Sequence, residues 1–417
     1  MATTRLVVWS CLQTRAFSMS ASCGMFKDVV ICGGLRTPIG SFRSKLSELP
    51  VTGLGAAAIY GTLEKAGIKP SIIQEAFVGV SIPSNAGPAP ARQAILGAGL
   101  DVSSVATGIN KMCSSGMKAI MLAAEHLQLG AQDVRCFFFA IGAGMENMSR
   151  VPFFLKRGDI PYGGIKIADG IEQDVLMDPY ANMHIGACAD KVAKKYGITR
   201  EEQDDYVVID YDRAITAWRD GIMANEIVPI EVEQNEQTII FDKDEQLGRI
   251  NTHEVPMLKS AFSEDGTITM GNMAAMGDGA AAVIMARVKA AEEHHIPSIA
   301  RILSVADAAT DPDEFAVAPA LVIPRVLEMA GLSINDIDLF EIHDQFAIIP
   351  LLTIRHFELD PDKVNAHGGS ISFAHPIGMS GARLIVHLLN VLRPGQKGLA
   401  AICNGGGGAA GMIIERL

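Results

Sequence analysis

The sequence lacks the features that mark several specialised classes of protein. No apolar stretch approaches the about 20 residues that a helix needs to span a bilayer, so we expect no membrane partner. Basic residues are not in excess: 35 Lys and Arg against 47 Asp and Glu give a formal net charge of −12, which argues against a nucleic-acid partner. The seven cysteines, an odd number, show no disulfide-framework spacing, which favours a reducing compartment.

The first 25 residues also lack acidic side chains, since none occurs before Asp28. This segment contains two arginines, several Ser and Thr and an apolar face, a composition typical of a mitochondrial transit peptide. Residues 15–18, Arg-Ala-Phe-Ser, resemble a processing site with cleavage after Phe17. We therefore expect residues 1–25 to direct the protein to the mitochondrial matrix; the alternative is an untargeted leader.

The remaining chain is composed like an ordinary enzyme, with 49% hydrophobic and 20% charged residues. Its length allows two or three domains. Short apolar runs alternate with helical patterns in two series, 29–142 and 299–403, which predicts α/β layers with a largely parallel sheet. The predicted helices include residues 52–66 and 318–330, and an amphipathic helix is predicted between the series at 200–225. The loops at Cys113 and His375 each lead into a helix at the same point of their series. An internal duplication would bring these two side chains to facing helix N-termini.

Two cysteines stand at chemically distinctive positions. Cys113 begins a helical run, where the positive end of a helix lowers a thiol pKa, so we expect a thiolate. Cys403 ends an apolar run and precedes four glycines, whose backbone N–H groups can approach a ligand closely and form an oxyanion site. Either thiol alone is more readily explained as core filler, because free cysteine is among the most buried residue types.

Three long motifs around these residues resemble the thiolase family, and the resemblance runs from Phe26 to Leu417. The motifs are Asn110-Lys-Met-Cys-Ser-Ser-Gly-Met-Lys-Ala, Asn365-Ala-His-Gly-Gly-Ser-Ile-Ser-Phe-Ala-His-Pro-Ile-Gly-Met-Ser-Gly-Ala-Arg and Cys403-Asn-Gly-Gly-Gly-Gly. Related ketosynthases use a Cys-His-His or Cys-His-Asn set, whereas this chain has a second cysteine. The chain is identified as a member of the thiolase family.

The resemblance implies the thiolase fold, with two pseudo-repeated α/β halves and central mixed sheets in layers. We expect the N-terminal half at 26–144 and 274–294, and the C-terminal half at 295–417. A loop domain at 145–273 is expected to cover the active site and to bind coenzyme A; an insert that builds an oligomer interface is an alternative that does not exclude this role. A homo-oligomer, dimer or tetramer, is also implied.

The resemblance assigns the chemical roles. Cys113 is the expected nucleophile that carries the acyl group, and His375 is the base that takes its proton. The backbone N–H groups of Cys113 and Gly405 are expected to bind the oxyanion. Cys403 is expected to remove a proton from the methyl carbon of the second acetyl-CoA and to return it in the reverse direction.

One catalytic motif departs from the usual pattern. The sequence has His343-Asp-Gln-Phe where biosynthetic thiolases typically have Asn-Glu-Ala-Phe. His343 is expected to donate from a ring nitrogen to the enolate oxygen, with His375 as the second donor. The alternative is a histidine that only caps a loop.

The expected coenzyme A contacts also rest on the resemblance. They are His184 near the pantetheine, Arg249 at the adenine, Ala274 in place of a serine, and Phe346 in the acyl pocket. Tyr211 matches a tyrosine with which some mitochondrial members hold potassium, and no other metal or cofactor is expected. A structural role for His184 and a solvated surface position for Arg249 are the alternatives.

The activity implied is that of an acyltransferase, which condenses two acetyl-CoA to acetoacetyl-CoA and coenzyme A, or runs in reverse, through an acyl-cysteine. The alternative is a 3-ketoacyl-CoA thiolase of fatty acid metabolism that prefers longer or 2-methyl-branched chains. A thioester-binding module without turnover is a third possibility, but such a module has no need of Cys113, His375 and Cys403 together.

Overall fold

The computed structural model describes residues 26, 28–130, 138–234 and 236–417. The predicted transit peptide at residues 1–25 lies outside them. Within the described part of the chain, no helix is both long and apolar enough to cross a membrane.

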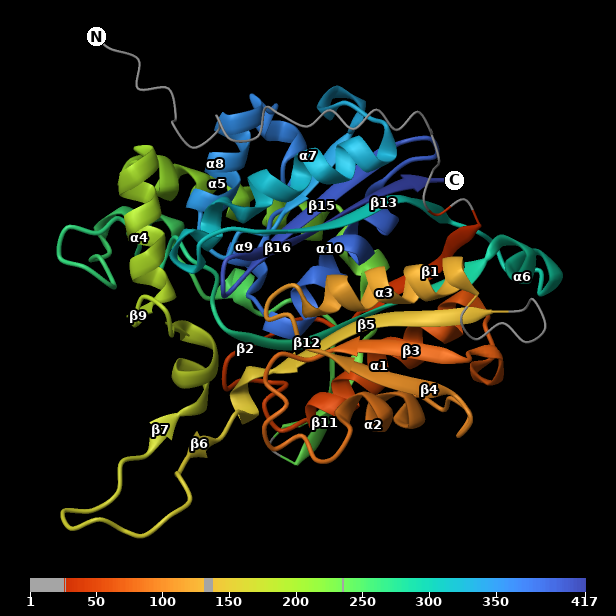
Figure 1. The fold of residues 1–417 in the computed structure, drawn as a ribbon, viewed down its shortest axis with the longest axis horizontal. Coiled ribbons are helices and arrows are strands. Elements are labelled where there is room, and N and C mark those ends of the chain that lie inside the picture. Colours follow the sequence, from red (N-terminus) through yellow and green to blue (C-terminus); the bar gives the residue numbers. More distant parts are fainter. Residues whose placement is uncertain (1–25, 27, 131–137, 235) are drawn as a thin grey trace.

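Ten strands form one sheet (Figure 1). Their order across the sheet is β14 (Leu339–Ile342), β15 (Lys397–Asn404), β16 (Gly408–Arg416), β13 (Ala300–Ala309), β1 (Val29–Arg36), β12 (Gly277–Arg287), β5 (Phe139–Asn147), β3 (Glu75–Gly79) and β4 (Val105–Ile109), with β2 (Gly40–Ser41) beside β12. The order β3-β5-β12-β1 of the first half is repeated in reverse as β13-β16-β15-β14 in the second half. The prediction of two repeated α/β halves with mixed sheets is therefore confirmed.

The prediction of a largely parallel sheet from the alternating pattern is wrong. Only β3 with β4, β3 with β5, and β14 with β15 pair in parallel; β1, β12, β13 and β16 pair with their neighbours antiparallel. The alternation of apolar runs does not reveal β12 or β16 as strands. Each inserts antiparallel into the middle of its half and separates strands that would otherwise lie side by side.

Helices form three layers around the two halves of the sheet (Figure 1). Helices α1 (Val51–Ala66) and α2 (Pro90–Gly97) cover the outer face of the first half, and α7 (Ala318–Ala330) and α8 (Ile348–Phe357) cover the second. Between the halves lie α3 (Ser115–Leu129) and α10 (Ile377–Val391), which pack on each other and on strands of both halves.

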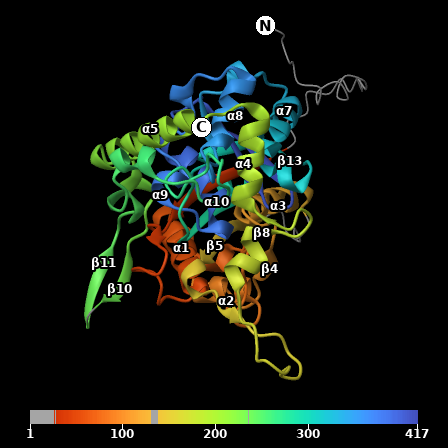
Figure 2. The same ribbon diagram turned by 90° about the vertical axis from the view of Figure 1, so that its left-hand side faces the viewer.

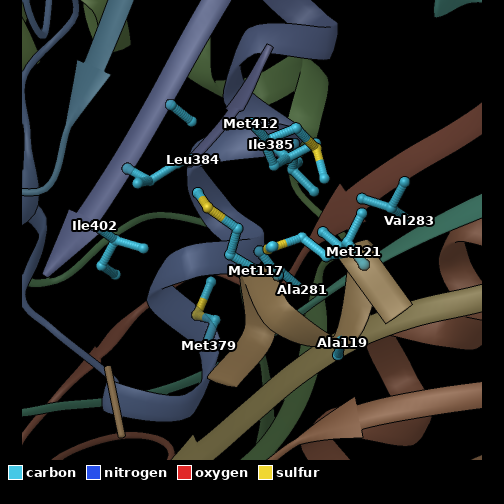
Figure 3. Close-up of a cluster of buried hydrophobic side chains, with 14 of the residues drawn as sticks. Met117, Ala119, Met121, Ala281, Val283, Met379, Leu384, Ile385, Ile402 and Met412 are labelled. Atoms are coloured by element: carbon cyan, nitrogen blue, oxygen red, sulfur yellow. The ribbon is translucent and has the colours of Figure 1, made fainter. Parts of the chain in front are cut away.

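The middle layer is the central core of the molecule. Figure 3 shows Met117 of α3, Met379 of α10 and Met412 of β16 meeting there, and all three are fully buried. The two helices cross at glycines: a Cβ atom on Gly116 would lie 2.7 Å from the carbonyl oxygen of Gly378. Without side chains at the crossing, the N-termini of α3 and α10 come together, as the duplication predicts.

An insert follows β5 and returns to β12. It contains an arm with strands β6 (Phe153–Phe154) and β7 (Ala168–Asp169) and a hairpin of β10 (Ile230–Gln234) and β11 (Gln237–Phe241), both of which project from the body (Figures 1 and 2). Between them lie a π-helical turn at Glu172–Leu176, β8 (Met177–Asp178), β9 (Met183–His184), α4 (Ile185–Tyr196) and α5 (Arg200–Arg219). The domain boundaries stay a prediction.

Helix α5 is shorter than the amphipathic pattern over residues 200–225 indicates. It begins at a capping box between Thr199 and Glu202, and it ends before Asp220, after which a 3₁₀ turn covers Met223–Glu226. Further 3₁₀ turns occur at Pro70–Ile72, Met148–Arg150, Gln246–Gly248, Thr252–Met257, Pro312–Val317, Ile334–Asp336 and Pro361–Lys363; α6 (Val288–Glu293) follows β12, and α9 (Ser370–Phe373) is a single turn.

Buried ion pairs fasten the insert to the body. The guanidinium of Arg36, at the end of β1, lies 2.5 Å from Glu226 and 2.7 Å from Asp244, and all three side chains are fully buried. His387 of α10 contacts the second oxygen of Glu226 at 2.8 Å. Burial alone would raise the pKa of Glu226, but Arg36 and His387 outweigh it and lower it to about 2.

The crossing of α3 and α10 generates a stability prediction. Gly116→Ala places a methyl group against the backbone oxygen of Gly378, so the free energy of unfolding should fall by about 1–3 kcal/mol in denaturant titrations. Gly248→Ala is the matched control, because a Cβ there meets no atom within 4 Å. Equal stability of the two variants would contradict the close helix contact.

Candidate active site

Cys113 lies in the tight connection between β4 and α3. Met112 before it adopts a left-handed conformation with φ 49°, and α3 begins two residues after the cysteine. The side chain is 3% exposed. The backbone N–H of Gly405 and its own N–H, the two groups expected to bind the oxyanion, lie near the sulfur and lower the thiol pKa. A positive φ costs free energy at a non-glycine residue, so the surrounding fold holds this turn.

The expected thiolate at Cys113 is wrong for the resting site. Burial raises the pKa of this thiol to about 12, and the carboxyl of Glu146 adds to the rise; the two N–H groups oppose it but do not outweigh it. Proximity to a helix N-terminus therefore does not ionise the sulfur. Cys113 rests as a neutral thiol and needs a base to become a nucleophile.

Cys403 lies beside Cys113, at the end of β15. The hydroxyl of Ser114 donates to the carbonyl of Ile402 at 3.3 Å and to the Asn404 side chain at 2.9 Å, so the turn after one cysteine is bonded to both neighbours of the other. Burial raises the pKa of Cys403 well above its usual value, and the nearby Cys113 raises it further. The two sulfurs therefore disfavour each other's ionisation.

His375 repeats the local geometry of Cys113 in the second half. Ala374 before it has φ 79°, and α10 begins two residues after it. The backbone N–H of His375 donates to Ala275 at 2.8 Å, while Nδ1 lies 2.6 Å from the Ser380 hydroxyl. Nε2 is buried and has no hydrogen-bond partner among the described residues. Burial, and then Arg383, lower the pKa of His375 to about 3, so the imidazole is neutral and can accept a proton.

His343 follows β14 and pairs with His375. Its Nε2 lies 3.1 Å from Nδ1 of His375, and the ring centroids are 4.3 Å apart. The ring is fully buried, and burial, then His375 and Arg383, lower its pKa well below the usual value. Its Nδ1 lacks a partner within the described part of the chain, so this nitrogen is the one available to donate to a substrate oxygen.

Glu146 is a buried residue of the site that the sequence analysis missed. Its carboxylate accepts backbone N–H groups from Ser81 at 3.0 Å, Ile82 at 3.2 Å and Gly378 at 2.8 Å, and so ties the first half to the N-terminus of α10. Burial raises its pKa to about 7. A carboxylate at the end of an otherwise apolar strand is the signal that could have revealed it, because buried acids are rare unless they are bonded.

A cavity of about 580 Å³ reaches His375. All four residues expected to contact coenzyme A line it, namely His184, Arg249, Ala274 and Phe346. The rest of the wall is mainly apolar and rich in methionine, and it includes Met148, Met270, Met273, Met276, Phe42, Phe262, Leu176 and Ile377. The methionines were not predicted; their flexible side chains suit a pocket that adapts to its ligand.

Two of these predicted contacts also have structural roles. Nδ1 of His184 accepts the N–H of Gly186 at 3.0 Å, which caps α4, and its ring stacks on Phe262 with centroids 4.4 Å apart. Arg249 contacts Ser44 at 2.7 Å and Glu245 at 3.1 Å. Both side chains are thus held in place at the cavity wall, and coenzyme A binding by them stays a prediction.

Tyr211 of α5 does not line the cavity; it is buried in a small cluster against which Ala274 of the cavity wall packs. Its hydroxyl donates to the carbonyl of Ile371 at 3.2 Å. The described residues contain no group of three or more His, Cys, Asp or Glu arranged to hold a metal ion. The potassium site stays a prediction that rests on the resemblance.

Comparisons with known proteins agree with this geometry. Residues 29–289 match the thiolase N-terminal domain and residues 296–416 the thiolase C-terminal domain. The mitochondrial acetyl-CoA acetyltransferase of Bos taurus is 47% identical over 94% of this chain and 92% of its own length, and that of Homo sapiens is 45% identical over 94% and 91%.

Solved structures of thiolases have the same fold as this chain. The Ascaris suum Acat5 thiolase in complex with coenzyme A superposes with a TM-score of 0.89 at 38% identity, over 94% of this chain and 100% of that chain. The human mitochondrial 3-ketoacyl-CoA thiolase reaches 0.88 at 30% identity, over 94% and 99%. Together with the paired cysteines at the junction of two repeated halves, these similarities establish that the chain belongs to the thiolase family.

Proposed function

We propose that this protein is an acetyl-CoA acetyltransferase, which condenses two acetyl-CoA to acetoacetyl-CoA and coenzyme A, or cleaves acetoacetyl-CoA with coenzyme A, through an acyl-cysteine. One observation supports this most directly: Ser114, the residue after Cys113, bonds to both neighbours of Cys403, and the helix that follows Cys113 crosses the helix that follows His375. Relatives at 44–47% identity over most of the chain carry this activity in their names.

In the first half-reaction Cys113 takes the acetyl group. His375 Nε2 removes the thiol proton, and the sulfur attacks the thioester carbonyl of acetyl-CoA. The oxyanion is bound by the N–H groups of Cys113 and Gly405, which lie near the sulfur. When the carbon–sulfur bond to coenzyme A breaks, the proton on His375 passes to the leaving sulfur, and neutral His375 remains.

In the second half-reaction Cys403 acts on a second acetyl-CoA. Its thiol proton passes to His375, and the thiolate then removes a proton from the methyl carbon. His343 Nδ1 donates to the enolate oxygen. The enolate carbon attacks the acetyl group, Cys113 leaves as a thiolate, and the proton held by His375 returns to it, so both cysteines end as thiols.

The two sulfurs do not ionise together, because Cys113 raises the pKa of Cys403. Each cysteine is therefore deprotonated in its own half-reaction. Cys113 is an uncharged thioester when Cys403 acts as the base, so the two negative charges never coincide.

The alternative of a 3-ketoacyl-CoA thiolase for longer or branched chains has less support. The human enzyme with that name is 30% identical to this chain, against 45% for the human acetyl-CoA acetyltransferase. The apolar, methionine-rich wall of the cavity has flexible side chains, and we propose that it tolerates an acyl group with a small branch such as 2-methyl.

We propose a mitochondrial protein of the matrix, because the relatives are named mitochondrial and residues 1–25 have the composition of a transit peptide. A homo-oligomer is supported by two surfaces. Strand β4 ends the sheet, so one edge of it is unpaired within the described residues. The arm exposes six apolar side chains: Phe153, Leu155, Ile160, Tyr162, Ile165 and Ile167.

Labelled acetyl-CoA tests the division of roles between the cysteines. Cys113→Ala should incorporate no label, whereas Cys403→Ala should form the acetyl-enzyme but lose condensation by at least about 10²-fold. Peptide mapping and turnover assays measure both effects. Cys32→Ala, which alters a buried cysteine of β1, is the control and should behave like the wild type.

A panel of acetoacetyl-, 2-methylacetoacetyl- and long-chain 3-ketoacyl-CoA in the thiolysis direction tests the substrate. The short substrates should have the highest kcat/KM, because the relatives at the higher identities act on acetyl-CoA by name. A preference for the long-chain substrate would overturn the acetyltransferase assignment in favour of the alternative.

The raised pKa of Cys113 predicts how alkylation depends on pH. Since the thiol pKa is about 12, its thiolate fraction rises about tenfold per pH unit, and so should the rate of iodoacetamide modification from about pH 7 to about pH 10. Mass spectrometry of the Cys113 peptide measures the rate. A plateau near neutral pH would instead indicate a resting thiolate–imidazolium pair.

A further inference from the structure

The single turn α9 (Ser370–Phe373) directly precedes Ala374 and His375, and two carboxylates hold it. Asp344 Oδ1 accepts the N–H of Ser370 at 2.6 Å, and Asp344 Oδ2 lies 3.5 Å from the N–H of Ile371. Asp210 Oδ2 accepts the N–H of Ser372 at 3.1 Å. Three successive N–H groups of the turn are therefore directed at two acids, which come from α5 of the insert and from the segment after β14.

These acids are linked to both histidines of the site. Asp344 is the residue after His343, and the turn that it holds leads into His375. One carboxylate therefore fixes the backbone next to both histidines. The Asp344 carboxylate lies close against the backbone at the start of the turn: a Cβ atom on Gly369 would lie 2.2 Å from Asp344 Oδ2. The contact of 3.1 Å between the two rings depends on this arrangement.

Charge and hydrogen bonding indicate that one of the two acids is protonated. Both side chains are at most 1% exposed, and neither forms an ion pair with any described residue. Asp210 Oδ1 is buried without a hydrogen-bond partner among those residues. Two unpaired carboxylates buried together would be costly, whereas a proton on Asp210 removes one of the two charges.

The groups around the two acids indicate that Asp344 is the one that stays ionised. Tyr206 donates its hydroxyl towards Asp344 Oδ2 at 3.4 Å, and Asn365 donates to that hydroxyl at 2.9 Å. Arg383 lowers the pKa of Asp344, although burial, the larger cause, leaves it raised. Burial and then the charge of Asp344 raise the pKa of Asp210 well above its usual value. Donors thus converge on Asp344, whereas Asp210 accepts the N–H of Ser372 at Oδ2 and has no partner for Oδ1 among the described residues.

We propose that protonated Asp210 and ionised Asp344 together clamp α9 and thereby position His343 and His375 for proton transfer. The two acids are positioning residues, since they act through the histidines. The kinetic consequence rests on the proposed function, because a displaced base slows the chemical steps more than it weakens substrate binding.

Substitution of each acid by asparagine tests the pair. Asp210→Asn supplies an amide N–H where the proton is proposed, so kcat and KM for acetoacetyl-CoA thiolysis should stay within about threefold of the wild type. Asp344→Asn places an amide N–H group opposite the N–H groups of α9, where two donors face each other without an acceptor. We therefore expect kcat to fall about 10²-fold, with KM changed less than about threefold. Asp190→Asn is the matched control: this buried carboxylate accepts the N–H groups of Thr267 and Ile268, and its loss should lower stability but not kcat.

Infrared spectroscopy provides a readout that does not depend on turnover or on the folding of Asp344→Asn. The wild type should show the band of a buried protonated carboxyl group that is missing from Asp210→Asn. Absence of that difference, equal loss of kcat in both asparagine variants, or full kcat in Asp344→Asn would each overturn the proposal. If the wild type itself does not cleave acetoacetyl-CoA, the proposed function fails, while the infrared test of the pair still stands.

Discussion

The close approach of α3 and α10 is the constraint on which the rest of the molecule depends. Each helix starts two residues after a reactive side chain, Cys113 or His375, so the distance between the helices sets where those side chains meet. Glycines at the crossing remove every side chain that would separate the N-termini. Buried methionines and aliphatic residues of both halves fill the layer around them, so the junction of the two halves is part of the central core.

Burial then determines the electrostatic state of this junction. It raises the pKa of Cys113 and lowers that of His375, so the resting pair is a neutral thiol beside a neutral imidazole. Charge therefore arises only when substrate binds, and backbone N–H groups fixed by the fold are ready to receive it. The long Arg36 network lies in the same buried interior but keeps its charges, because every carboxylate in it has a cationic partner.

Much of the fold follows from pattern. The periodicity places α1 and α7 within a residue of their observed bounds, because these helices pack a single apolar face on a sheet. It fails for β12, whose Gly-Asp-Gly-Ala-Ala-Ala start carries weak strand formers. That segment is extended because it is enclosed between α1 on one face and α10 on the other, where only small side chains fit.

The sequence by itself determined which groups can react and in which order the chain supplies them: a cysteine, two histidines and a second cysteine, set in motifs whose glycines allow close backbone approach. It could not determine their protonation states or the buried groups that hold them in position. The state of Cys113, the anchoring by Glu146 and the pairing of Asp210 with Asp344 were decided by tertiary structure alone. A pKa depends on burial and on charges brought from distant parts of the chain, and neither exists until the chain has folded.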